Sequence, residues 1–190
     1  PTPSIGGVGL IKNYKKMITM DLKEHNNLIL IIGKTEGHLD QSLFARDVLL
    51  EKKGPPPEVN LFNEKNNGET ILKLIEENLI KSAHDVSLGG IITALSKMSI
   101  LGNKGFKLNK LKILMNKFEY FFGEDQGRYI LEISKDNLKK VETILKENSV
   151  YFDQLGVVTS KEIIINNEPI FNIDELIQSN TSWLKKYMAQ

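Results

Sequence analysis

The chain of 190 residues is long enough to bury a sizeable core, and its 41% hydrophobic content is ordinary for one globular domain, or one domain plus a piece of another. A net charge of +1 gives no reason to expect nucleic acid or a membrane surface as partner, and no apolar run approaches the roughly 20 residues of a membrane helix. The lack of cysteine excludes disulfides and thiolate chemistry and is compatible with a cytoplasmic protein.

The N-terminal quarter is expected to hold an extended segment, a buried strand and a short helix. Residues 1–16 carry two prolines and three glycines around short apolar runs, which favours extended backbone with a strand at Val8–Ile11. Leu28–Ile32 is a continuous apolar run, typical of a strand buried on both faces. Ser42 is placed to cap a helix that runs to Leu50.

The middle of the chain predicts two helices. Pro55–Pro57 interrupts regular structure, because proline prevents helix continuation. Beyond it, apolar spacing predicts a helix within residues 68–78 and a second one over Gly90–Leu101, ending at Gly102. Residues 107–117 fit neither a helix nor a strand clearly.

The C-terminal third is expected to alternate strands and helices. Residues that favour β-structure predict a strand at Arg128–Ile133, and apolar spacing predicts an amphipathic helix at Asp136–Glu147. Without a strict βαβ rhythm, the fold class is α+β, a mixed α/β sandwich. The remaining expected elements are a hairpin of Leu155–Thr159 with Glu162–Ile165, and helices at Ile173–Ser179 and Trp183–Met188.

The first candidate site is a polar run at the start of a predicted helix. His84, Asp85 and Ser87 are followed by the adjacent glycines Gly89 and Gly90. Unpaired N–H groups at a helix start bind anions, and glycines let an anion approach the backbone. The alternative is a tight turn in which Asp85 or Ser87 accepts hydrogen bonds from the first N–H groups of the helix. His84 is more typical of a hydrogen-bonded core histidine than of a base.

The second candidate site is a loop that holds Glu124, Asp125 and Gln126 ahead of Arg128. Adjacent carboxylates on a loop can bind magnesium, or they can accept backbone hydrogen bonds and pair with the arginine. Gln126 suits either a neutral polar substrate or bracing of the loop. Arg128 is one of two arginines, with Arg46, and its planar fork cannot be replaced by lysine.

Five sequence blocks follow one another along nearly the whole chain. They are Pro1–Ile11, Leu30–Leu43, Pro55–Val59, Ala83–Gly90 and Phe122–Tyr129. In this order and spacing they resemble the C-terminal part of the large subunits of the phosphoribosylformylglycinamidine synthase family, within the aminoimidazole ribonucleotide synthetase superfamily. That family usually has a second aspartate where Leu88 stands here, which weakens the case for a metal at this turn. It also commonly has glycine where Asp40 stands.

The resemblance implies an ATP-dependent ligase of de novo purine biosynthesis. The amide oxygen of formylglycinamide ribonucleotide is phosphorylated, and ammonia then displaces the phosphate to give the amidine. Ammonia comes from a glutaminase subunit, and a small accessory subunit joins the complex. ATP and Mg²⁺ are bound mainly by upstream domains, so neither a catalytic residue nor a metal ligand is expected in this chain. The location implied is cytoplasmic.

The resemblance also implies a domain plan. Residues 1–24 would be a connecting strand and linker from an upstream domain, and residues 25–190 would be the C-terminal domain. Residues 1–16, lacking their sheet partner, would then be available for self-association. The alternatives are a non-catalytic scaffold or interaction domain, or another superfamily member such as aminoimidazole ribonucleotide synthetase. The residues expected to face substrate or phosphate are His84, Asp85, Ser87, Gly89, Gly90, Glu124, Asp125, Gln126 and Arg128.

Overall fold

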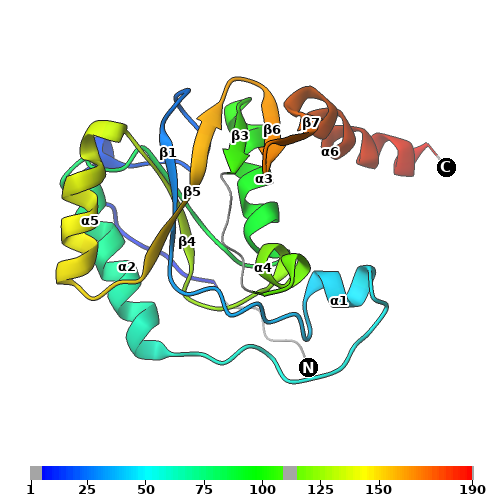
Figure 1. Cartoon of the computed structure of the whole chain (residues 1–190), viewed down its shortest axis with the longest axis horizontal. Helices are drawn as coiled ribbons and strands as arrows, with labels where there is room; N and C mark the ends of the chain where they lie inside the picture. The colour runs from blue at the N-terminus through cyan, green and yellow to red at the C-terminus, as the bar shows by residue number, and fades with distance from the viewer. Residues whose placement is uncertain (1–5, 109–114, 190) are drawn as a thin grey trace.

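The computed structural model describes residues 6–108 and 115–189 and shows one sheet with helices on both faces (Figure 1). Seven strands lie in the order β2-β4-β1-β5-β3-β6-β7, and each neighbouring pair is antiparallel except β3 and β6. The strands are β1 Leu28–Ile32, β2 Ser82–Asp85, β3 Gly105–Leu108, β4 Tyr129–Ile133, β5 Phe152–Thr159, β6 Glu162–Ile165 and β7 Glu168–Asn172.

Six α-helices and two short 3-10 turns complete the described chain. In Figure 1, α2 and α5 cover one face of the sheet, and α3 and α4 cover the other. The helices are α1 Leu43–Asp47, α2 Leu61–Glu76, α3 Gly90–Gly102, α4 Lys117–Phe122, α5 Leu138–Glu147 and α6 Ile173–Met188, with 3-10 turns at Tyr14–Lys16 and Lys135–Asn137.

The burial of strand β1 shows why the sheet has a layer of helices on each face. All five of its residues are buried. Leu28, Leu30 and Ile32 belong to the α2/α5-side core, together with Leu74 of α2, whereas Ile29 and Ile31 belong to the α3-side core. Because successive side chains of a strand point to opposite faces of the sheet, a strand that is apolar at every position must be covered on both faces. The expected mixed α/β sandwich is therefore confirmed, and so is the strand at Leu28–Ile32.

Several local predictions hold with small shifts of boundary. The Ser42 side chain accepts a hydrogen bond from the backbone N–H of Ala45 at 3.1 Å and caps α1, although the helix ends at Asp47. Helix α5 begins two residues later than expected, after a 3-10 turn. Helix α2 is the exception, since it begins at Leu61, well before the expected range of 68–78, where the Asn60 side chain caps it by accepting from the N–H of Asn63 at 3.0 Å.

The expected hairpin of β5 with β6 is wrong. Strand β3 lies between them and pairs with both, because Phe106 and Leu108 are fully buried there. The hairpin is formed instead by β6 and β7, around Asn166 and Asn167. Both asparagines have positive φ, as two-residue hairpin turns require.

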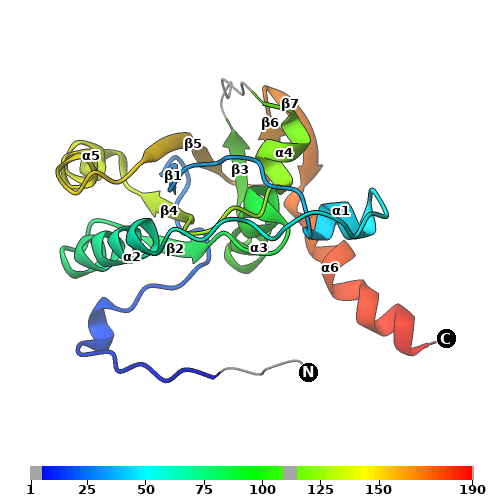
Figure 2. The ribbon, with the colours of Figure 1, turned by 90° about the horizontal axis from the view of Figure 1, so that it is seen from below.

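Both chain ends also differ from expectation. The predicted helices at 173–179 and 183–188 are one continuous helix, α6. Residues 8–11 form no strand, because this part of the chain is exposed and has no neighbouring strand to pair with. Figure 2 shows the N-terminal segment running clear of the body before it joins β1. Of the uncertain segment 107–117, residues 109–114 lie outside the described chain.

A buried carboxylate fixes the entry into β1. Glu132 of β4 is fully buried, and its oxygens accept hydrogen bonds from the backbone N–H groups of Lys23 and Glu24 at 2.7 and 3.0 Å. The Asn27 amide and the Ser82 hydroxyl also donate to it, at 2.6 and 3.2 Å. A buried charge is tolerated only when it is fully hydrogen-bonded, so this glutamate holds residues 23–27 against the sheet.

We expect Glu132→Gln to lower the free energy of unfolding by about 2–4 kcal/mol, because an amide offers a single acceptor and turns a donor toward other donors. Urea denaturation of the variant measures this loss. Glu147→Gln, at an exposed position of α5, is the matched control and should unfold like the wild type. Equal midpoints for Glu132→Gln and Glu147→Gln would contradict the assigned role.

Candidate functional site

The run His84–Gly90 links β2 to α3. His84 pairs with Ile130 of β4, so the run begins on an edge strand of the sheet. Gly89 has a φ of 82° and precedes the first residue of α3, Gly90, whose φ is 69°. A Cβ on Gly90 would lie 2.6 Å from the carbonyl oxygen of Phe121. Glycine is needed at Gly90 because the backbone of the α4 end packs directly against it.

The N-terminus of α3 is capped from a distant part of the chain. The side chains of Asp85 and Ser87 accept no hydrogen bond from it, but the backbone carbonyl of Ser87 accepts one from the N–H of Gly90 at 3.0 Å, so the expected bond is made by the backbone. The side-chain acceptor is Oε1 of Glu124, which accepts from the backbone N–H of Gly89 at 2.8 Å and from that of Leu43, in α1, also at 2.8 Å. A carboxylate beside two helix starts is favoured by their partial positive charge.

Asp125 binds another stretch of backbone. Its carboxylate accepts hydrogen bonds from the N–H groups of Glu36, Gly37 and His38 at 3.1, 3.1 and 2.9 Å. The carboxylate also lies 3.4 Å from Nη1 of Arg128. Of the two alternatives for these acidic residues, the structure shows backbone hydrogen bonding and pairing with the arginine.

Arg128 is the anchor of this loop. It is 1% exposed, and its Nε and Nη2 donate to the carbonyl oxygens of Asp125 and Gly123 at 3.1 and 2.6 Å. Nη1 donates to the hydroxyl of Thr35 at 3.2 Å. Burial lowers the pKa of the guanidinium, and the Asp125 carboxylate opposes that shift. We refer to residues 123–128 with these contacts as the 123–128 clamp.

Other candidate residues lie around the clamp. Gln126 is exposed and borders a cleft of about 640 Å³ between the loop at 33–38, the prolines at 55–57 and the first half of α2. Asp85 and Ser87 are exposed. Nδ1 of His84 lies 3.1 Å from the Asp85 carboxylate, and its Nε2 is buried with no hydrogen-bond partner among the described residues.

The two candidate loops do not fit a magnesium site, and the N–H of Gly89 is not free for a phosphate. Within residues 6–108 and 115–189, no group of three or more His, Cys, Asp or Glu side chains is placed to hold a metal ion. The carboxylates of Glu124 and Asp125 are already used by backbone N–H groups. The N–H of Gly89 that could meet a phosphate is used by Glu124.

Comparison with known proteins identifies the family. Residues 24–165 match the family described as AIR synthase related protein, C-terminal domain. The chain belongs to this family. It is 69% identical over 188 residues to the phosphoribosylformylglycinamidine synthase subunit PurL of Pelagibacter ubique, and 38% identical over 189 residues to that of Rhodopseudomonas palustris. The match covers 99 and 100% of this chain but 26% of each relative, so the chain spans about a quarter of their length.

Solved structures agree on the fold. Thermotoga maritima PurL complexed with FGAR superimposes with a TM-score of 0.68 at 20% identity, covering 86% of this chain and 30% of that one. A chain of a HypE–HypF complex gives a TM-score of 0.57 at 18% identity, covering 78 and 52% of the two chains. The expected fold class, the C-terminal domain type of the superfamily, is confirmed.

We expect Gly90→Ala to destabilise the chain by roughly 2–4 kcal/mol, through backbone strain and the clash with residues 121–123. Gly68→Ala is the control, since a Cβ there meets no atom closer than 3.8 Å. In the interior of α2 this change should stabilise by about 0.5–1 kcal/mol. Thermal denaturation compares the two variants, and an unchanged midpoint for Gly90→Ala would show that close approach is not required.

Proposed function

We propose that the chain is the C-terminal domain of the large subunit of a phosphoribosylformylglycinamidine synthase, an amidine-forming ATP-dependent ligase of purine biosynthesis. The 69% identity to the Pelagibacter ubique subunit over 188 residues carries this proposal. We further propose that residues 1–24 connect to a preceding domain and that residues 25–190 form the C-terminal domain. The family match, which begins at residue 24, supports that boundary.

Within such an enzyme, this domain would have a structural role and would not supply the reacting groups. Glu124, Asp125 and Arg128 would act by holding the 123–128 clamp, because their polar atoms are engaged inside the chain. Gly89 and Gly90 would contribute by allowing the tight turn from β2 into α3, and His84 lies in β2 just before that turn. The exposed Asp85, Ser87 and Gln126 are the candidates left to face a substrate or phosphate.

ATP and Mg²⁺ would be bound mainly by preceding domains. One observation supports this division, and a second supports nucleotide binding by the longer protein. The described residues of this chain hold no group of three or more side chains placed to bind a metal ion, and the N–H of Gly89 at the start of α3 is already bound to Glu124. Thermotoga maritima PurL, whose fold this chain shares in part, has been solved complexed with ATP, AMPPCP and ADP.

The partners of the longer protein would be a glutaminase subunit and a small accessory subunit, in a cytoplasmic amidotransferase complex. The solved Thermotoga maritima PurLQS assembly supports the existence of partner subunits. We also propose contacts with the preceding domains of the same polypeptide and self-association through residues 1–16. We propose no nucleic acid or membrane partner. No helix within the described ranges is long and apolar enough to cross a bilayer.

We expect the 190-residue chain alone to show neither ATP hydrolysis nor amidine formation when supplied with ATP, Mg²⁺, formylglycinamide ribonucleotide and ammonia. The longer polypeptide that contains it should catalyse both, because phosphoryl transfer requires nucleotide, metal and acceptor to be held together. Phosphate release and product formation are the measurements. Turnover by the isolated chain would overturn the division of roles, and an inactive longer polypeptide would favour the scaffold alternative.

A further inference from the structure

Helix α6 carries an apolar stripe that the domain covers along half of its length. Apolar residues recur at spacings of three, four and seven, which places them on one face of the helix. The members of this stripe are Ile173, Leu176, Ile177, Leu184, Tyr187 and Met188.

The two ends of the stripe have opposite surroundings. Ile173 is fully buried and Leu176 packs against the α3-side core. Leu184, Tyr187 and Met188 are 58, 62 and 75% exposed. Figures 1 and 2 show why, since α6 leaves the body of the domain after its first turns. We call residues 181–188 the outer half of α6.

The outer half has the features of a recognition surface. The indole of Trp183 stacks on the ring of Tyr187, with centroids 5.6 Å apart and an interplanar angle of 11°. Stacked aromatic rings offer large contact area at small entropic cost.

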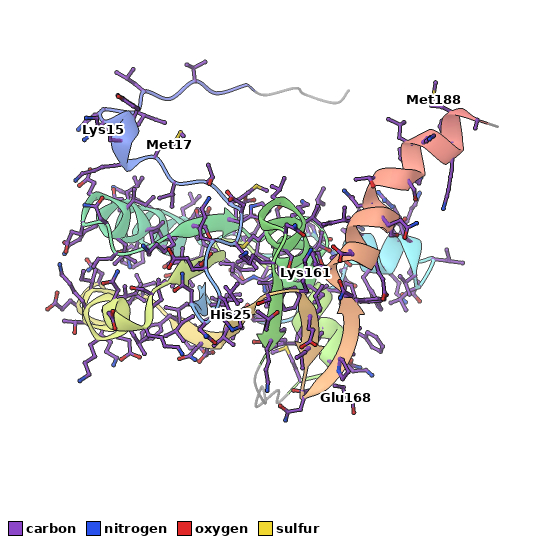
Figure 3. All side chains as sticks on the ribbon, turned by 90° about the horizontal axis from the view of Figure 1, so that it is seen from above. Lys15, Met17, His25, Lys161, Glu168 and Met188 are labelled. Atoms are coloured by element: carbon purple, nitrogen blue, oxygen red, sulfur yellow. The ribbon has the colours of Figure 1, made fainter. Side chains whose placement is uncertain are left out.

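We propose that the outer half of α6 docks onto the preceding part of the longer polypeptide, an inference that rests on the proposed function. The relatives are about four times as long as this chain, so most of such a polypeptide lies outside the structure. The N-terminal segment, where that part would be attached, projects beyond the body on the same side as the outer half. Figure 3 shows Lys15, Met17 and Met188 on that side, with Glu168 on the opposite side.

The N-terminal segment strengthens this assignment. Its apolar side chains Val8, Leu10 and Tyr14 are also exposed, so one side of the domain presents two separate uncovered apolar segments. A partner joined through that segment binds intramolecularly, at an effective concentration in the millimolar range. A single neighbouring domain that covers the N-terminal segment and the outer half of α6 would explain why the apolar side chains of both are exposed in this chain.

Charge argues against a second copy of this chain as the occupant. Lys185 and Lys186 lie within the outer half, and neither forms an ion pair in the part of the chain that the structure describes. Antiparallel pairing of two outer halves would bring these lysines of both copies together, and like charges in an interface are unfavourable. The occupant surface that would complement the outer half is therefore apolar, with carboxylates at its rim to pair with the lysines.

Hydrogen exchange tests this docking on the longer polypeptide and on the 190-residue chain. Backbone amides of residues 181–188 should exchange at least about tenfold more slowly in the longer polypeptide, because a covered helix end no longer frays. Leu184→Asp should remove that protection. Leu72→Asp, at an exposed apolar position of α2, is the matched control and should leave it intact.

Equal exchange of residues 181–188 in the two proteins would overturn the inference. Protection that depends on the concentration of the 190-residue chain, with a dimer in light scattering, would assign the surface to a second copy and would also overturn it. Amidine formation by the longer polypeptide is measured on the same samples. An active but unprotected protein refutes the docking alone, whereas a protected but inactive one refutes the proposed ligase function alone.

Discussion

The hydrogen bonding of two loop carboxylates to distant backbone, from the buried Asp125 and the half-buried Glu124, is the constraint on which this domain depends most. Asp125 accepts from three consecutive N–H groups after β1, and Glu124 accepts from the starts of α1 and α3. Arg128 balances the charge and holds the loop carbonyls. Removing any one member would leave a buried polar group without a partner, which is costly. The 123–128 clamp thereby joins segments that lie far apart in the sequence.

This constraint also limits what the domain can do chemically. A carboxylate that already accepts two or three backbone hydrogen bonds has little capacity left for a metal ion, and at the start of α3 the N–H of Gly89 is already bound to Glu124 rather than open to a phosphate. The same polar residues that suggest a binding site in the sequence therefore serve to position the exposed Asp85, Ser87 and Gln126. In our proposal, a neighbouring domain supplies the nucleotide and metal contacts, and this domain presents a rigid surface to it.

The sequence predicts the parts of the fold that depend on local patterns. The apolar run of β1 and the amphipathic spacing of α5 are visible without any knowledge of their neighbours. The pairing of β5 is not, because β3 and β6 come beside it from different parts of the chain.

The candidate site shows the same division between local and distant information. The glycine turn and the acidic loop could be located from residue types, but the acceptor that caps α3 comes from 35 residues away. Glu132 had a local signal, a lone charge within the apolar strand β4, yet its partners at residues 23–27 are more than 100 residues distant.

Replacing each of the two arginines with lysine in the longer polypeptide tests most directly whether Arg128 holds the 123–128 clamp, with Arg46 as the control. Arg128→Lys should lower the stability of this domain by about 2–4 kcal/mol while leaving kcat and KM of the folded enzyme within about threefold, and the exposed Arg46→Lys should change neither. An Arg128→Lys enzyme of unchanged stability whose KM or kcat is altered by more than about tenfold would contradict the account, since arginine would then act on substrate directly.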